Sequence, residues 1–506
     1  MKERVSALQI AVIDDGINTI GYGIGALAFD LEVNGQYAVV PRTSAVDRRS
    51  HGTVCAAIIR RYRPTAALGS VKILHSETHT GHIEQLLAAL RWCGRQGIKL
   101  VHLSVGTTQR LDFPKVHDAV TALYRQGCVI IAAYHNRQIY TMPAAHPFVI
   151  GVQCATDSMD DEFSWACENG LNPYITASGQ HLLLSESGRE TRTEAMNSYA
   201  APLVTARVAR FLDAQPDASL IDVKKWLVAE AAEDSIQVNQ AVSLDFFNTA
   251  VLVGKNLAAR ELLWECIPFE IKNFVTPLDF NDNMTDAKTG VILDDTGFTN
   301  AEFINVYECL RGGSQAGVVY VGMNQAHKQM LNDCGTFLWS REAYHASFAT
   351  GAALPDDIEI PVVCIYGGLR DVIPFTQAIC RFLLRDEYFA KPVGHFDFAF
   401  LYGFEYIEDV TTRKDRLSRI AQVYGCDIIL FAVETGAEND ENQIYAAADV
   451  SIVFDSRLSI PHTDDNPCIV IDQDQGQNNT HDQNPRNPAH YESVYAKLLW
   501  CLTNDD

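Results

Sequence analysis

Short apolar runs alternate with amphipathic segments from residue 8 to about residue 230, and this alternation constrains the fold more than any other feature. The runs LQIAVID, SVKIL, KLVHLSV, CVIIAAY and FVIGV have the length and composition of buried strands. Between them, IEQLLAALRWCGRQG and PKVHDAVTALYRQG carry apolar residues at helical spacing and end on glycine. The pattern predicts an α/β fold in which helices cover both faces of a parallel sheet.

The remainder of the 506-residue chain predicts two more α/β regions. After about residue 235 the sequence turns polar and then restarts, with TAVLV, GVILD and GVVYVGM as candidate strands. A loop-rich stretch precedes IPVVCIYG, and strands and helices then alternate to a final helix near 490–503. We therefore expect an N-terminal domain at 1–235, a middle region at 246–345 and a second doubly wound α/β domain at 358–506.

Charge and cysteine usage narrow the setting in which the chain acts. Lys and Arg number 40 and Asp and Glu number 63, which gives a net charge of −23 and disfavours binding to nucleic acid or anionic membranes. No apolar run approaches the roughly 18 residues of a membrane span, and the first residues lack the pattern of a signal peptide. The thirteen scattered cysteines include no CxxC pair, so we expect reduced thiols and a cytoplasmic protein.

Three segments place chemically capable side chains at the ends of predicted elements. Asp14 ends the strand in IAVIDDGIN, His51 opens the helical run HGTVCAAIIRRY, and Ser198 precedes the helix in AMNSYAAPLVTARVARFL. Taken singly, each is weak evidence: a strand-end aspartate is more often a turn or cap residue, a lone histidine shows little, and a lone serine is commonly a helix N-cap. Together they occur in the chain order Asp, His, Ser, which is the order of the catalytic residues in subtilisin.

On these residues the N-terminal region resembles the subtilisin-like (subtilase) family of serine proteases. DDG at 14–16, HGT at 51–53 and NSYAAP at 197–202 resemble the three catalytic motifs of that family. LSVG at 103–106 resembles its substrate-binding strand, and VIIAAYHN at 129–136 resembles its strand that ends on the oxyanion asparagine. The resemblance implies a subtilisin-like parallel sheet and a serine endopeptidase that needs no cofactor or catalytic metal ion.

The resemblance also assigns a role to each matched residue. Ser198 would be the nucleophile, His51 the general base and Asp14 the group that orients the imidazole. Asn136 and the backbone N–H of Ser198 would hold the oxyanion. Ser104, Val105, Gly106 and His135 would bind the substrate.

The sequence departs from the family pattern at several of these positions. Met196 and Asn197 replace Gly-Thr before the serine, and Tyr199 replaces a methionine after it. His135 replaces a glycine that borders the primary specificity pocket in the family, so we expect a narrower or more polar pocket. Cys55 follows His51 by one helical turn; it is either a buried thiol or the free cysteine that makes some family members sensitive to mercurials.

The C-terminal half carries no catalytic signature and contains neither GxxxxGK[ST] nor GxGxxG. The stretches TAVLVGKNLAARELLWECIPFEIKNFVTPLDF and PVVCIYGGLRDVIPFTQ resemble a peptide-maturation-system family that is encoded beside radical-SAM enzymes. That resemblance implies removal of a leader from a modified precursor peptide, with a radical-SAM maturase as a possible partner. Two alternatives stay open: a general intracellular housekeeping protease, and a peptide-binding pseudoprotease scaffold.

Overall fold

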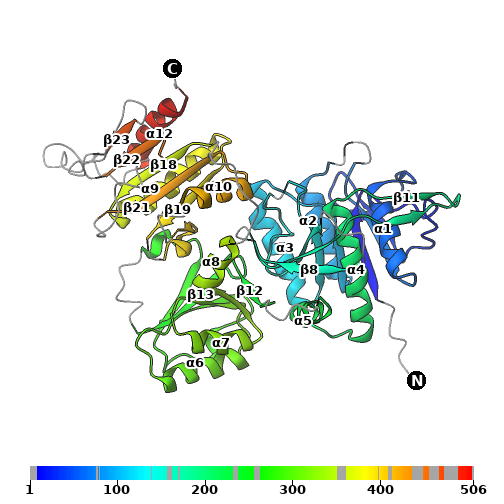
Figure 1. Ribbon diagram of the computed structural model, residues 1–506, viewed down its shortest axis with the longest axis horizontal. Helices are drawn as coiled ribbons and strands as arrows, with labels where there is room; N and C mark the ends of the chain where they lie inside the picture. The colour runs from blue at the N-terminus through cyan, green and yellow to red at the C-terminus, as the bar shows by residue number, and fades with distance from the viewer. Residues whose placement is uncertain are drawn as a thin grey trace. The chain divides into compact units, whose positions relative to one another are not determined.

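The chain was analysed as a computed structural model, in which two compact units are distinguished (Figure 1). One unit comprises 1–258 and 272–350, and the other comprises 259–271 and 351–506. The structure describes residues 8–75, 78, 80–137, 139–155, 162–168, 171–231, 237–255, 263–349, 360–396, 398–407, 413–435, 448–454, 467–471 and 488–503.

A nine-stranded sheet organises the N-terminal region, and its seven inner strands run parallel. An antiparallel strand closes each edge. In sheet order the strands are β3 (Val39–Pro41), β2 (Asp30–Val33), β4 (Ala67–Lys72), β1 (Gln9–Asp14), β5 (Leu100–Leu103), β6 (Val129–Ala133), β7 (Ile150–Ala155), β9 (Tyr174–Ser178) and β8 (Phe163–Ala166). Strands β1, β5 and β6 are almost wholly buried, because helices cover both faces of a parallel sheet.

Two helix pairs flank this sheet. Helix α1 packs against α4 and α2 packs against α3, and the two pairs lie on opposite sides of the sheet in Figure 1. The helices are α1 (His51–Tyr62), α2 (Ile83–Arg95), α3 (Phe113–Arg125), α4 (Asn197–Ala214) and α5 (Leu220–Glu230). A separate hairpin of β10 (Leu182–Leu184) and β11 (Glu190–Arg192) precedes α4, and η1 (Arg110–Asp112) precedes α3. The predicted α/β class is therefore confirmed for this region.

The first unit also contains a second sheet, of six strands. Five of these strands form parallel pairs in the order β12, β17, β16, β15, β13, with β14 beside β13. The strands are β12 (Gln240–Ala241), β13 (Thr249–Gly254), β14 (Glu270–Val275), β15 (Thr289–Asp294), β16 (Gly317–Tyr320) and β17 (Phe337–Ser340). Its helices are η4 (Asp282–Met284), α6 (Asn300–Gly312), α7 (Gln325–Asp333) and α8 (Arg341–Ala349).

The second unit is built on another six-stranded sheet, with every described pair parallel. Its order is β20 (Glu405–Tyr406), β19 (Ala390–His395), β21 (Ile428–Glu434), β18 (Val362–Gly367), β22 (Val450–Val453) and β23 (Cys468–Val470). The chain winds from β18 to one side and then crosses to β22 on the other, which is the doubly wound pattern expected from the sequence. The helices are η3 (Trp264–Cys266), α9 (Leu369–Arg385), η5 (Ala399–Tyr402), α10 (Arg413–Tyr424) and α12 (Pro488–Thr503).

Segment 259–271 belongs to the second unit although it lies between strands of the first in sequence. The Gln377 side-chain amide donates to the Cys266 carbonyl, and the Leu263 amide donates to the Tyr402 hydroxyl. The chain therefore does not divide into consecutive halves. Among the described residues, none of the helices combines the length and the apolar character needed to cross a lipid bilayer.

Candidate active site

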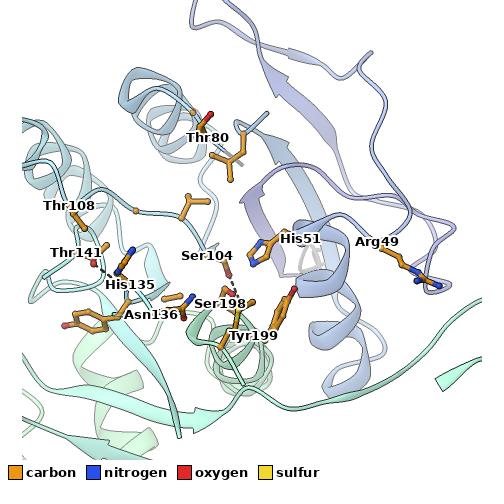
Figure 2. Close-up of a pocket in the computed structure, with 17 residues that line it drawn as sticks. Arg49, His51, Thr80, Ser104, Thr108, His135, Asn136, Thr141, Ser198 and Tyr199 are labelled. Atoms are coloured by element: carbon orange, nitrogen blue, oxygen red, sulfur yellow. Dashed lines mark hydrogen bonds between the residues drawn. The ribbon is translucent and has the colours of Figure 1, made fainter. Parts of the chain in front are cut away.

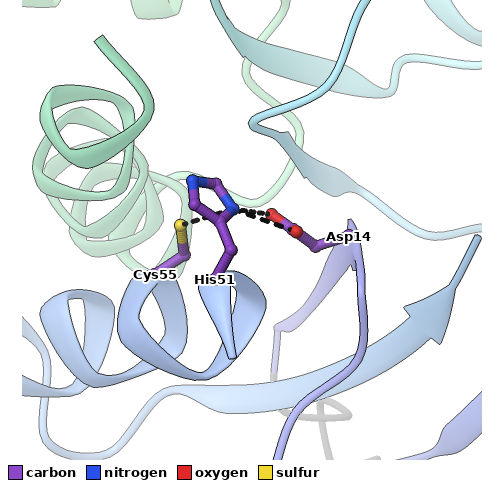
Figure 3. A group of neighbouring side chains, drawn as sticks. All are labelled: Asp14, His51 and Cys55. Atoms are coloured by element: carbon purple, nitrogen blue, oxygen red, sulfur yellow. Dashed lines mark hydrogen bonds and ion pairs between the residues drawn. The ribbon is translucent and has the colours of Figure 1, made fainter. Parts of the chain in front are cut away.

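Asp14 and His51 meet where β1 ends and α1 begins. The His51 Nδ1 atom lies 3.0 Å and 2.9 Å from the two carboxylate oxygens of Asp14 (Figure 3). Asp14 is fully buried, whereas 20% of the His51 side chain is exposed. The imidazole is thus held by Asp14 through Nδ1, and its Nε2 atom is available to hydrogen-bond a group in the pocket.

The start of α1 is fixed by the residues around the histidine. The Asp15 carboxylate accepts from the amide N–H groups of His51 (3.1 Å) and Gly52 (2.8 Å), and Ser50 accepts from the Thr53 amide. These bonds satisfy helix amides that lack an intrahelical partner, and the negative charge suits the helix N-terminus. A Cβ on Gly52 would lie 2.6 Å from the Gly16 carbonyl oxygen, so the close approach of the two segments requires glycine there.

Burial and pairing act in opposite directions on the two titrating groups. Burial alone would raise the pKa of Asp14, but the charge and hydrogen bond of His51 hold that pKa below its ordinary value. Burial would lower the pKa of His51, but the Asp14 carboxylate raises it above the ordinary value. The Asp14 carboxylate therefore favours the imidazolium, as a base that accepts a proton during reaction requires.

Ser198 lies in the first turn of α4. Its side chain faces the same pocket as His51 (Figure 2) and is largely buried. In the described part of the chain no hydrogen bond joins its hydroxyl to His51; such bonds are often long without substrate and tighten when substrate binds. The helix N-terminus supplies unpaired amides and a positive electrostatic potential at this position.

Asn136 stands beside Ser198, just after β6. Its Oδ1 accepts from the Asn197 amide at 3.0 Å, which identifies the oxygen end of the side chain and leaves the Nδ2 end as a donor. The side chain of Asn197 is itself buried: it accepts from the Cys154 amide at 2.6 Å and donates to the carbonyls of Tyr134 and His135. The residue that departs from the family pattern at 197 therefore ties α4 to β7 and to the segment after β6.

A pocket of about 720 Å³ brings the predicted residues together (Figure 2). His51, Ser198 and Asn136 line it, as do all four predicted substrate-binding residues: Ser104, Val105, Gly106 and His135. Asp14 lies behind His51 and does not line the pocket. A Cβ on Gly106 would approach Thr141 Cγ2 to 2.7 Å, so the segment that follows β5 packs closely on the segment of Thr141.

Sequence reasoning missed a buried relay under the serine, formed by His102, Ser104 and Thr205. The Ser104 hydroxyl donates to the Ser198 carbonyl at 3.0 Å, and His102 Nε2 lies 3.0 Å from the Ser104 oxygen. His102 Nδ1 lies 2.8 Å from the Thr205 hydroxyl oxygen. Thr205 also donates to the Ala201 carbonyl at 2.9 Å, just as Ser104 donates to Ser198, so a neutral His102 ring, which carries one N–H, can donate to one of these two hydroxyls. Burial lowers the pKa of His102 to about 4, so the ring is neutral near pH 7. A histidine within an otherwise apolar strand was the only signal in the sequence.

We expect His102 to position Ser198 through Ser104. Glutamine reaches as far as His102 Nε2 and can still donate to Ser104, whereas asparagine reaches only as far as Nδ1 and keeps the contact with Thr205. His102→Asn should therefore lower kcat about five- to tenfold with an unchanged KM, the effect of one lost hydrogen bond, while His102→Gln stays near wild type. Steady-state kinetics with melting temperatures test this. An equal loss of kcat in both variants would show that His102 only fills the core and does not position Ser198.

Cys55 completes the surroundings of His51. Its sulfur lies 4.0 Å from His51 Nδ1 and 3.5 Å from the Ser198 carbonyl oxygen (Figure 3 shows the contact with His51). Burial raises the pKa of this thiol, so it is neutral near pH 7 and adds no charge to the site. Asp14, His51 and Cys55 offer ligand atoms within 4.8 Å of one another, so a thiophilic cation bound there would prevent His51 from acting as the base that the sequence predicts.

Asn136 gives the clearest single test of the oxyanion geometry. We expect Asn136→Ala to lower kcat about 10²- to 10³-fold with little change in KM, because the bond forms mainly in the transition state. The substitution also frees the Asn197 amide, so the melting temperature is measured alongside the kinetics. A kcat that stays at the wild-type value while chemistry limits turnover would contradict the assignment.

Comparison with known proteins places the similarity in the first half of the chain. Residues 6–253 match the family model described as the subtilase family. The minor extracellular protease Epr of Bacillus subtilis is 29% identical over 207 residues, which cover 38% of this chain and 29% of Epr. Subtilisin BL of Lederbergia lenta is 26% identical over 234 residues, which cover 44% of this chain and 82% of that protein. Among solved structures, a cold adapted subtilisin-like serine proteinase aligns over 45% of this chain and 83% of its own, with 20% identity and a TM-score of 0.37.

Proposed function

Residues 6–253 belong to the subtilase family of serine endopeptidases, and from this premise we propose that Asp14, His51 and Ser198 hydrolyse peptide bonds as a catalytic triad. The observation that carries the proposal is the Asp14–His51 pair: Asp14 holds His51 from behind, and His51 lines a pocket together with Ser198 and Asn136. These four residues come from four separate segments of the sequence. Their convergence on one pocket favours catalysis over four independent structural roles.

The geometry supports an ordered sequence of proton transfers. Ser198 Oγ attacks the scissile carbonyl carbon while His51 Nε2 takes the hydroxyl proton, and Asp14 stabilises the resulting imidazolium through Nδ1–H. The carbonyl oxygen becomes an oxyanion, which accepts from Asn136 Nδ2 and from the Ser198 amide. His51 then protonates the leaving amine, and a water molecule repeats the cycle to release the acid from Ser198.

For the substrate, we propose a dedicated precursor peptide from which this domain removes a leader. Two features support this. The C-terminal half resembles a peptide-maturation-system family, and its second unit, in the described ranges, has no side-chain cluster like that of the catalytic pocket. A unit whose described residues form no such cluster suits recruitment of the precursor, or of a radical-SAM maturase that modifies it. The thirteen cysteines are free thiols, which favours the reducing conditions of the cytoplasm.

Recruitment has to be tested on the full chain, because the peptidase sheet and the middle sheet share an aromatic core. Phe148 stacks on Tyr124 at a centroid distance of 3.9 Å and packs edge-on against Phe337 of β17 at 5.1 Å. The buried Lys224 donates to the Pro147 carbonyl at 2.9 Å and lies over the Phe337 ring. A chain ending near residue 235 would lose Phe337 and expose these groups to water.

The experiment compares digestion products of the full-length protein. It is incubated with candidate precursor peptides from neighbouring genes and with an unfolded protein such as casein, and the products are analysed by mass spectrometry. Leader removal predicts one cut in the precursor, with a lower KM than for a short peptide that spans the same bond. Many cuts in both substrates would support a housekeeping protease instead. Failure of a fluorophosphonate to label the folded protein would favour a pseudoprotease.

A further inference from the structure

Arg49 is the only permanently charged residue among the described residues that line the catalytic pocket. The lining is otherwise made of neutral polar, apolar and histidine side chains, and it contains no aspartate or glutamate. This local composition contrasts with the net charge of −23 for the whole chain. A permanently charged cation therefore lines the same pocket as His51 in a protein that is otherwise strongly acidic.

The main chain at Arg49 is held firmly, two residues before His51. The Asp47 carboxylate accepts from the Arg49 amide at 2.7 Å, and the next residue, Ser50, is the N-cap of α1. Figure 2 shows Arg49 on the far side of His51 from His135 and Thr141. In this view the Arg49 side chain extends away from His51, so the arginine lies at the outer rim of the pocket lining, and His135 lies toward the other end.

The guanidinium group of Arg49 forms no ion pair or hydrogen bond within the described part of the chain, and its side chain is exposed. Nearby arginines behave differently: Arg42 pairs with Asp30 and Arg63 pairs with Asp213. At the opposite end of the pocket, burial and the positive charge of Arg137 lower the pKa of His135. Positive charge therefore reaches the pocket from both ends, and no carboxylate in the lining offsets it.

We propose that Arg49 selects peptide substrates that carry an aspartate or glutamate side chain close to the scissile bond. This inference rests on the proposed function, since it concerns which peptides the same pocket accepts. A guanidinium binds a carboxylate with two parallel hydrogen bonds, which gives orientation as well as attraction. Because Arg49 is exposed, water screens the pair, and we expect about a fivefold preference in kcat/KM rather than an absolute requirement.

Arg48 provides a matched control. It is adjacent in sequence, exposed and without an ion pair in the described ranges, but it does not line the pocket. Arg48→Glu and Arg49→Glu both change the net charge from −23 to −25, since each removes one positive charge and adds one negative charge. The net charge of the protein therefore changes equally in both variants, and only the charge at the pocket lining differs.

The test uses the full-length protein and internally quenched peptides that place Asp, Asn or Lys at each of three positions on either side of the scissile bond. We expect the wild type to prefer Asp over Asn about fivefold at one position. Arg49→Gln should remove that preference, and Arg49→Glu should reverse it in favour of Lys by a similar factor. Arg48→Gln and Arg48→Glu should keep the wild-type preference.

A neutral fluorophosphonate separates this inference from the proposed function. Equal labelling rates in all variants show an intact nucleophile, and absence of labelling in the folded wild type would refute the protease assignment itself. If turnover of the peptides is too slow to measure, the same peptides are used to slow labelling, which reports their binding. A wild type without acidic preference at any position, or a preference that survives Arg49→Gln, would overturn the inference.

Discussion

Replacing Ser198 by alanine should abolish both peptide hydrolysis and labelling by a fluorophosphonate. Loss of the nucleophile in subtilisin lowers kcat about 10⁶-fold, and we expect a loss of the same order here. The substitution removes one oxygen, and no described hydrogen bond depends on the Ser198 hydroxyl, because Ser104 and Cys55 contact its carbonyl instead. The melting temperature should therefore change little.

The matched control for Ser198→Ala is Ser164→Ala. Ser164 lies on the edge strand β8, is exposed and bonds to Thr176, away from the catalytic pocket. The fluorophosphonate should label Ser164 neither in the wild type nor in Ser198→Ala, and Ser164→Ala should keep the wild-type kcat/KM. Labelling that persists at the wild-type rate in Ser198→Ala would locate the reactive serine elsewhere.

Much of the site could be predicted from the sequence because its residues sit at the ends of strongly patterned elements. β1 is a continuous apolar run that ends on Asp14, and the apolar face of α1 begins directly after His51. Carboxyl ends of parallel strands share one edge of the sheet, so the pattern alone brings Asp14, Ser104 and Asn136 to the same side. The order Asp14, His51, Ser198 along the chain then predicted which residues form the triad.

The features that escaped prediction depend on contacts between segments far apart in sequence. In the sequence His102 is a single polar residue within an apolar strand, and only the fold shows that it lies between Thr205 and Ser104. The edge strands β3 and β8, and β2 next to β3, are short and mixed in polarity, so their periodicity is weak. The assignment of 259–271 to the second unit has no local signature either, because it rests on contacts with Gln377 and Tyr402. The domain boundaries near 235 and 358 remain predictions.

Asp14→Asn should lower kcat about 10⁴-fold at neutral pH, although the side chain keeps its size. A carboxylate accepts the proton on His51 Nδ1, whereas the amide can present its NH₂ group to that nitrogen and so favour the wrong tautomer. The variant also withdraws the charge that stabilises the imidazolium as the reaction proceeds. Because Asp14 is fully buried, no solvent can replace that charge.

The direction of the pH dependence follows from the pKa of His51. The wild-type pKa is raised by Asp14, and the enzyme needs the neutral imidazole, so the acid limb of log(kcat/KM) should lie above the ordinary value of 6.5. In Asp14→Asn burial still lowers the pKa of His51 but the opposing charge is gone, so this limb should move to lower pH.

The free energy of unfolding should depend on pH through the same two pKa shifts. The raised pKa of His51 stabilises the fold below about pH 6.5, and this contribution is lost as the pH rises through the folded-state value. The lowered pKa of Asp14 stabilises the fold above about pH 4 and is lost as the pH falls. The difference in unfolding free energy between wild type and variant should therefore be largest between about pH 4 and pH 6.5.

Asp295→Asn is the control for removing a buried carboxylate from a histidine. Asp295 directly follows β15 and lies 2.6 Å from Nδ1 of His327 in α7. It is buried, at 8% exposed against 0% for Asp14, and neither Asp295 nor His327 lines the catalytic pocket. Its replacement should leave both kcat and the acid limb at their wild-type values, whatever it does to the melting temperature. Steady-state rates of the wild type, Asp14→Asn and Asp295→Asn, measured from about pH 5 to pH 10, test this prediction. An acid limb that stays in place in Asp14→Asn, or that moves equally in Asp295→Asn, would show that Asp14 does not control the titration of His51.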